Sequence, residues 1–305
     1  MMTKEVFTEN VKKAIEMKMD GVTVAVKTVT KNNELELTGL VINKPGDVVA
    51  PTVYVEDFYE SYENGRDFDE IVDKIIDLSR KEVPSEFRNA ADNFTDANYV
   101  KENVIAVVCN AARNEQLLSE IPHILKEDLA IYFKVKMDIG GSASDGIGSI
   151  TIRNEHLPII GLTIEELYEA AKANIKKSAI VKTMEDVMKE MMAKDGMPEE
   201  MISLMFGMPP EQQMYIVGND NSIFGAVNMF DTDLLDTVVE TVNSNLYILP
   251  SSIHEVIAVS ENLGTPDSLA AMVREVNGTQ VALEEQLSDN MYYYNTETKE
   301  VSLVS

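Results

Sequence analysis

Residues 245–260 read NLYILPSSIHEVIAVS, and this stretch holds two short apolar runs, 246–249 and 256–259, on either side of a polar centre. Apolar runs of four or five residues that end at a proline are typical of buried strands, because a buried helix would need a longer run. The stretch therefore predicts two strands with a bend between them. Four polar side chains lie at this bend, where they can be aimed at a partner or substrate: Ser251, Ser252, His254 and Glu255.

The segments on either side of this stretch alternate between strand and helix patterns. Residues 214–230 predict a hairpin, in which a turn joins MYIVG to IFGAVNMF, and residues 231–243 predict a helix. Thr265 and Pro266 predict the start of another helix, because threonine caps a helix N-terminus and proline fits its first turn. The tail MYYYNTETKEVSLV predicts a terminal hairpin. The order ββαββα followed by a hairpin predicts an α+β fold of antiparallel sheets with packed helices, not a doubly wound sheet.

The earlier part of the chain also mixes helices and strands. Residues 5–19 predict a helix, and the alternation within GVTVAVKTVT and ELELTGLVI predicts a β-hairpin. We expect a helix with an acidic outer face over 67–81 and a helix opened by a capping box over 163–175. Between these helices, three strands are expected at 104–109, 129–137 and 147–153.

Changes in composition divide the chain into four regions. We expect an N-terminal region of helix, hairpin and acidic helices over 1–95, and a β-rich middle region over 96–180. A methionine-rich helical segment over 181–212 then leads into an acidic C-terminal α+β domain over 213–305.

The methionine-rich segment is open to two interpretations. Residues 184–214 contain nine methionines among 31 residues, and their spacing predicts two short helices joined by Gly196, Met197 and Pro198. Methionine fills irregular space in cores and also forms adaptable binding surfaces. The helical spacing favours core packing, and a partner-binding helical hairpin is the alternative.

The chain is strongly acidic, with a formal net charge of −26 that is unevenly distributed. Residues 195–305 contain 18 acidic residues and two basic ones, Arg274 and Lys299, and residues 195–273 contain no basic residue. Because phosphate binding needs cations, we expect no direct nucleic-acid binding by this third. The acids suit a solvated surface that aids solubility. They also allow a basic partner, or a nucleic-acid mimic in which the nine acids of residues 56–77 take part.

The sequence predicts a cytoplasmic protein without a membrane segment. No apolar run approaches the roughly 18 residues that a membrane span needs. The first residues, MMTKEVFTENVKK, place charges where a signal peptide would need its apolar core. The single cysteine, Cys109, excludes an internal disulfide, and its apolar surroundings predict a buried, inert thiol.

The polar bend contains the residue types of a hydrolase centre. Ser252, His254 and Glu255 could supply nucleophile, base and orienting carboxylate, with Ser252 and His254 on one side of an extended segment. Neighbours along one strand rarely reach the geometry of an assembled triad, however, and no G-x-S-x-G elbow exposes the serine. The favoured interpretation is that the serines cap the strand and the histidine is hydrogen-bonded at the bend. Ser251 and His123 are the remaining candidate binding residues.

No metal or cofactor site follows from the histidines. The chain has three, His123, His156 and His254, and their spacing matches no metal-ligand pattern. The pair His254-Glu255 begins like a zinc-binding H-E-x-x-H helix, but the second histidine would fall at Ala258 and the context is a strand. We therefore predict no metal ion and no cofactor.

Motifs spread over nearly the whole chain resemble a bacterial family known as domain of unknown function 5688. The resemblance lies in KNNELELTGLVI, APTVYVEDFYESYENG, IPHILKEDLAIYF, LYILPSSIHEVIAVS and the tail motifs MVREVN and EEQLSDNMYYY. It implies a cytoplasmic bacterial α+β protein and assigns no catalytic residues. The methionine-rich segment carries none of the resemblance.

Taken with the charge distribution, these features favour a non-enzymatic interaction or regulatory protein with an unidentified protein partner, and the charge allows but does not require that this partner is basic. A hydrolase centred on Ser252, His254 and Glu255 is one alternative. An acidic mimic of nucleic acid is the other.

Overall fold

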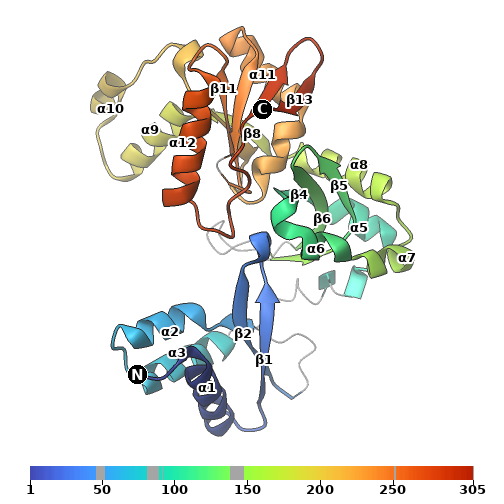
Figure 1. Cartoon of the computed structure of the whole chain (residues 1–305), viewed down its shortest axis with the longest axis vertical. Coiled ribbons are helices and arrows are strands. Elements are labelled where there is room, and N and C mark those ends of the chain that lie inside the picture. Colours follow the sequence, from blue (N-terminus) through green and yellow to red (C-terminus); the bar gives the residue numbers. More distant parts are fainter. Residues whose placement is uncertain (46–51, 81–88, 91, 138–147, 251, 305) are drawn as a thin grey trace. The chain divides into compact units, whose positions relative to one another are not determined.

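The computed structural model describes the whole chain except residues 46–51, 81–88, 91, 138–147, 251 and 305 (Figure 1). The chain forms two compact units, Met1–Asn89 and Ala90–Ser305. Across the described residues, the strands form three sheets, and every paired strand is antiparallel to its neighbour. Helices and antiparallel sheets together confirm the predicted α+β class.

In the first unit, helices pack on a sheet with the strand order β1-β2-β3. Its strands are β1 (Thr23–Thr30), β2 (Glu36–Asn43) and β3 (Thr52–Tyr54). Its helices are α1 (Lys4–Lys18), α2 (Glu56–Glu63) and α3 (Phe68–Arg80). The apolar faces of these elements share one core, which includes Phe7, Ile15, Leu40, Ile42 and Ile75. The predicted hairpin and both predicted helices are therefore confirmed.

The first sheet of the second unit is built around β6 (Leu129–Met137). β4 (Val104–Asn110) pairs along one edge of β6, and β5 (His123–Lys126) and β7 (Gly148–Thr151) share the other edge. The accompanying helices are α5 (Ala97–Asn103), α6 (Glu115–Glu120), α7 (Leu157–Ile160) and α8 (Ile164–Ile175).

Both faces of β4 are buried, which explains its nearly continuous apolar run. Successive side chains of a strand point to opposite faces. Ala106 packs in the same core as Leu167 of α8, whereas Cys109 packs on the other side with Leu118 of α6. Cys109 is buried, as predicted, and burial raises the pKa of its thiol to about 12.

The second sheet of this unit has the order β13-β12-β10-β11-β9-β8. In chain order its strands are β8 (Ala179–Thr183), β9 (Tyr215–Asn219), β10 (Leu246–Pro250), β11 (Val256–Ser260), β12 (Tyr292–Asn295) and β13 (Glu300–Leu303). The two predicted strands of the opening stretch are β10 and β11, and the predicted terminal hairpin is β12 with β13.

Helices cover both faces of this sheet. These are α11 (Thr232–Val242) and α12 (Pro266–Thr279), whereas α9 (Met184–Lys194) and α10 (Glu199–Met205) lie between β8 and β9 in the chain. Ile248 of β10 shares a core with Val238 of α11, whereas Leu249 packs with Leu269 of α12. In the part of the chain that the structure describes, we find no helix with the length and apolarity of a membrane span.

One predicted strand is wrong, because IFGAVNMF forms a 3-10 helix, η6 (Gly225–Phe230), instead of the second strand of a hairpin. Gly225 lies against backbone: a Cβ there would be 2.6 Å from the His254 carbonyl oxygen. Phe224 has φ +58°, and the Asn219 side chain bonds both the N–H and the carbonyl of Ile223, so the chain turns sharply after β9. The edge of β9 is taken by β8, and the C-terminal order is β-3-10-αββα plus the hairpin rather than ββαββα plus the hairpin.

Candidate functional site

The bend between β10 and β11 places Ser252 and His254 close together but gives them separate partners. Ser252 is buried, with 8% of its surface exposed. Its hydroxyl accepts a hydrogen bond from the His254 backbone N–H at 3.0 Å. The Ser252 N–H donates to the Glu255 carbonyl at 3.3 Å. These contacts close the turn. Within the described residues, the Ser252 hydroxyl and the His254 imidazole form no hydrogen bond with each other, and Ser251 lies outside the described residues.

The His254 ring joins three segments of the second unit. Its Nδ1 accepts a hydrogen bond from the Phe224 backbone N–H at 3.3 Å, and its ring stacks on the Phe224 ring at 6.0 Å. Its Nε2 lies 3.5 Å from Glu285 Oε1, in the turn after α12. Because Nδ1 accepts, the proton of the neutral ring is on Nε2 and faces Glu285. This geometry holds the unusual backbone of Phe224 in place.

The other two histidines make local contacts. His123, at the start of β5, has Nδ1 3.0 Å from the Ile121 carbonyl oxygen. His156 accepts a hydrogen bond from the Arg153 backbone N–H at 3.0 Å, also through Nδ1. Across the described ranges, no group of three or more His, Cys, Asp or Glu side chains is placed to hold a metal ion.

Several acids of the first unit already have cationic partners. Lys18 of α1 lies 3.3 Å from Asp69 and 2.9 Å from Asp73 of α3. Lys4 lies 3.0 Å from Glu56, and Arg80 lies 3.4 Å from Asp77. These pairs reduce the negative charge that residues 56–77 could present to a nucleic-acid-binding groove.

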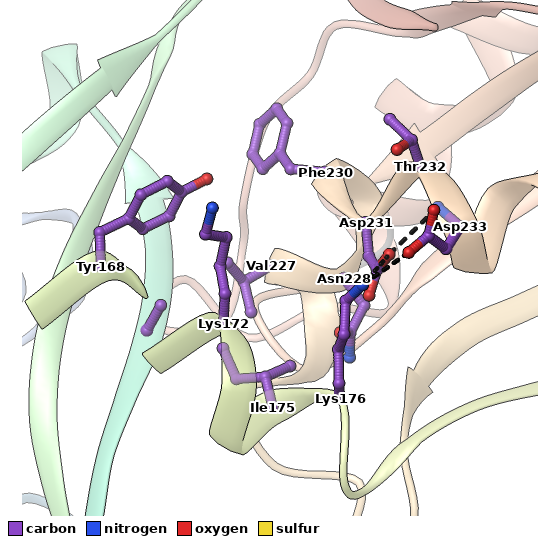
Figure 2. A pocket seen from close by; sticks show the side chains of 11 residues that line it. Tyr168, Lys172, Ile175, Lys176, Val227, Asn228, Phe230, Asp231, Thr232 and Asp233 are labelled. Atoms are coloured by element: carbon purple, nitrogen blue, oxygen red, sulfur yellow. Dashed lines mark hydrogen bonds and ion pairs between the residues drawn. The ribbon is translucent and has the colours of Figure 1, made fainter. Parts of the chain in front are cut away.

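A pocket of about 240 Å³ lies between α8 and the junction of η6 with α11 (Figure 2). On the α8 side it is lined by Tyr168, Lys172, Ile175 and Lys176, which share a helix face because they are three or four residues apart. The opposite wall includes Asn228, Phe230 and the first residues of α11: Thr232 and Asp233, with the cap Asp231.

Charged pairs lie within this pocket. The Lys176 ammonium is 2.7 Å from Asp233 and 3.7 Å from Asp231, and the hydrogen bond to Asp233 raises the pKa of Lys176 (Figure 2). The Lys172 ammonium is 2.6 Å from Glu169 and 4.7 Å from the centre of the Tyr168 ring. Sequence reasoning did not find this pocket, because its two walls lie about 60 residues apart in the chain. The spacing of Tyr168 and Lys172, one helical turn apart, was the only local signal.

The methionine-rich segment forms one side of a large apolar hollow. A groove of about 500 Å³ lies between α9, the loop before β9 and the start of α12. We call it the methionine groove, because five methionines line it: Met184, Met188, Met208, Met214 and Met272. Among the described residues that line it, Glu185 carries the one charge.

Glu185 ties α9 to the loop that closes this groove. Its carboxylate is 2.7 Å from the Lys189 ammonium and accepts hydrogen bonds from the Met208 N–H at 3.3 Å and the Gln213 amide at 3.4 Å. The hydrogen bond from Lys189 is the largest of the contributions that lower the pKa of Glu185, so its carboxylate stays ionised at neutral pH. Polar contacts therefore lie at the edge of the groove, and most of its lining is apolar.

A model of the family of unknown function DUF5688 matches residues 4–296. The chain belongs to this family, which confirms the resemblance carried by its motifs. No curated protein and no solved structure matches the chain.

Proposed function

We propose that this protein is a non-enzymatic interaction or regulatory protein that binds a basic, amphipathic helical segment of a partner protein in the methionine groove. The observation that carries the proposal is the groove itself, an open apolar hollow of about 500 Å³ on a strongly acidic protein. An amphipathic helix laid into an apolar groove is a recurring mode of peptide recognition.

The apolar surface of the groove is accessible. Met188, Met208 and Met272 are 42%, 53% and 41% exposed. Met191 on the next turn of α9 and Met205 at the end of α10 are also exposed. Exposed apolar patches mark interaction sites on soluble proteins. Methionine side chains are flexible and polarizable, so they can repack around different apolar side chains of a partner.

α9 supports this assignment because it has no buried residue. A helix that contributed its methionines to the core would bury one face. The spacing of Met184 and Met188 therefore aligns them along a groove that is open to a partner.

The charge around the groove selects a basic partner. Exposed acids lie on the elements that line or adjoin the groove: Asp186, Glu200, Glu211, Asp267 and Glu275. Two nearby lysines are already paired, Lys189 with Glu185 and Lys182 with Glu190. Lys194 and Arg274 are the other basic residues of α9 and α12, so the acids outnumber the remaining cations. An acidic rim attracts lysine and arginine and repels acidic segments, which gives both faster association and selectivity.

The bend residues favour this function over a hydrolase. The Ser252 hydroxyl and His254 Nδ1 are both engaged with backbone N–H groups, so neither is arranged as a nucleophile activated by a base.

The proposal is tested with two labelled peptides whose binding is followed by fluorescence anisotropy. One is an amphipathic leucine–lysine helix of about 18 residues, or five helical turns, and the other replaces every lysine with glutamate. We expect the protein to bind the leucine–lysine peptide and not the leucine–glutamate peptide. Raising the salt concentration from about 0.1 M to about 0.5 M should weaken binding, because the screening length shortens.

A matched pair of variants separates the groove from general acidity. Met188→Gln with Met272→Gln makes the groove polar at exposed positions, and Met17→Gln makes the same change on α1, where Met17 is 80% exposed. The double variant should bind the leucine–lysine peptide at least about tenfold more weakly, since partial burial of two methionines contributes ~1.4 kcal/mol or more. Met17→Gln should bind it like the natural protein. Equal binding by the double variant and the natural protein would refute the assignment.

A further inference from the structure

We infer that the pocket between α8 and α11 is a second binding site, which takes a small amino carboxylate such as a free amino acid. It shares no lining residue with the methionine groove, so it is a separate function of the same unit. The inference depends on three features of the pocket: a donor end, an unpartnered buried acceptor, and an apolar wall between them.

The donor end is formed by two residues of α8. Figure 2 shows the tips of Tyr168 and Lys172 pointing into the space beneath Phe230. A lysine ammonium has three N–H donors, and in Lys172 one of them faces Glu169. Within the described residues, the Tyr168 hydroxyl has no hydrogen-bond partner. The remaining donors of Lys172 and the Tyr168 hydroxyl suit a carboxylate, which accepts several charge-assisted hydrogen bonds at once.

The acceptor end is formed by Asn228 of η6. Asn228 is 1% exposed, and its Nδ2 donates to the Gly218 carbonyl at 2.7 Å. That bond sets the orientation of the amide, since a flipped amide would place two oxygens together. Oδ1 is then a buried acceptor with no partner among the described residues. A buried acceptor without a partner is destabilising by ~1–3 kcal/mol, and an N–H group of a ligand would satisfy it.

A carboxylate lies beside this acceptor. The Asp231 side chain is 14% exposed, and its Oδ1 caps α11 by accepting from the N–H groups of Asp233 and Leu234. The Lys176 ammonium, 3.7 Å from Asp231 and 2.7 Å from Asp233, offsets one of these two negative charges. The negative charge that remains favours a protonated amine over a neutral N–H donor at this end of the pocket. The two ends together match a zwitterion, with its carboxylate at Lys172 and its ammonium at Asn228 and Asp231.

The apolar wall and the size of the pocket set the class of side chain. Ile175, Val227 and Phe230 line it, and its volume of about 240 Å³ suits a small molecule. Pockets that combine an apolar lining with a few convergent polar groups are the usual form of small-molecule sites. A leucine or phenylalanine molecule has the apolar body and the two polar groups that this pocket presents.

The test is isothermal titration calorimetry on the full chain with L-phenylalanine and L-leucine. Two analogues divide the contributions: 3-phenylpropionate lacks the amine, and phenethylamine lacks the carboxylate. We expect saturable binding of at least one of the two amino acids, and binding at least about tenfold weaker for each analogue, which corresponds to ~1.4 kcal/mol. An absence of saturable binding of both amino acids up to about 10 mM would overturn the inference.

Variants of α8 locate the site. Lys172→Met removes the charge while keeping the length of the side chain, and Tyr168→Phe removes only the hydroxyl. Each should weaken binding of the amino acid severalfold or more without changing the circular dichroism spectrum. Lys177→Met is the control, because the Lys177 ammonium bonds Asn174 and does not line the pocket. Unchanged affinity in Lys172→Met would overturn the assignment of the donor end, and with it the inference.

Discussion

Replacing Tyr292 with phenylalanine should destabilise the second unit, because it removes one hydroxyl from a partly buried contact between its two sheets. Tyr292 of β12 is fully buried, and its hydroxyl donates to Asp128 Oδ1 at 2.5 Å. Asp128 lies in the turn between β5 and β6, and its other oxygen accepts from Ser288 at 2.7 Å and Asn290 at 2.9 Å. The ring of phenylalanine fills the same space, so the change isolates the hydrogen bond.

The magnitude follows from the charge on the acceptor. A hydrogen bond to an ionised group contributes ~1.5–3 kcal/mol to stability. Asp128 keeps two of its three donors in Tyr292→Phe, and it is half-buried, so water can replace part of the lost bond. We therefore expect a loss of about 2 kcal/mol. The neighbouring tyrosine is a matched control: the Tyr293 hydroxyl donates to Glu261 at 2.8 Å from a half-buried position, and Tyr293→Phe should cost under about 1 kcal/mol.

Urea unfolding followed by far-ultraviolet circular dichroism measures both losses, and a double-mutant cycle with Asp128→Asn isolates the contact. The cycle should give a coupling energy of about 1 kcal/mol or more between Tyr292 and Asp128. Equal destabilisation by the two phenylalanine variants, or a coupling energy near zero, would refute the argument that this contact holds the two sheets together.

Two further predictions concern stability. Gly225→Ala should lower the melting temperature by about 5 °C or more, because the added Cβ would lie 2.6–2.9 Å from backbone atoms and overpacking costs ~1–3 kcal/mol or more. Differential scanning calorimetry measures the melting temperature, and an unchanged value would contradict the close packing. Burial raises the pKa of Tyr292, of Tyr294 and of Cys109 above their ordinary values. Because the folded protein holds these protons more tightly than the unfolded chain, their contribution to stability is complete below about pH 8.5 and is lost as the pH rises toward the raised values. Urea midpoints should therefore fall between about pH 8.5 and pH 11, and a constant midpoint would show that these groups titrate normally.

The elements with a clear period were predictable, and those set by distant contacts were not. The apolar runs around Ile248 and Ala258 predict strands because both faces of β10 and β11 are buried. IFGAVNMF has a strand-like composition, but the close approach of His254 to Gly225 cannot be read from local sequence. The edge strand β8 was missed for a related reason, because a short run after a helix gains its strand conformation by pairing with β9.

The candidate sites followed the same rule. Composition pointed to the methionine-rich segment, and nine methionines among 31 residues were visible without a structure. The groove itself could not be predicted, because its other wall is α12, which supplies Met272 and lies far along the chain. The α8 pocket needed Asn228 and Asp231 to be brought to Tyr168 and Lys172, and no spacing rule connects residues so far apart in the chain.

Within the second unit, motifs that carry the family resemblance meet one another in space. Asp128, within IPHILKEDLAIYF, bonds Ser288 and Tyr292, within EEQLSDNMYYY. Ile253, within LYILPSSIHEVIAVS, donates its N–H to the Glu285 carbonyl at 2.8 Å, and the His254 ring faces the Glu285 side chain. These motifs therefore join the two sheets of the second unit, and their polar residues are explained by that structural role.

This placement bears on where function should be sought. Ser252 and His254 drew attention because polar residues interrupt an apolar strand pair, yet their contacts are those of a joint between segments. The side chains of the α8 pocket and the methionines of residues 184–214 lie outside those motifs and take no part in the contacts between them. A substitution at the joint should change stability first and binding only as a consequence, whereas Met188→Gln and Lys172→Met should change binding at constant stability. Measuring stability and binding on the same set of variants therefore distinguishes the framework of this fold from its sites.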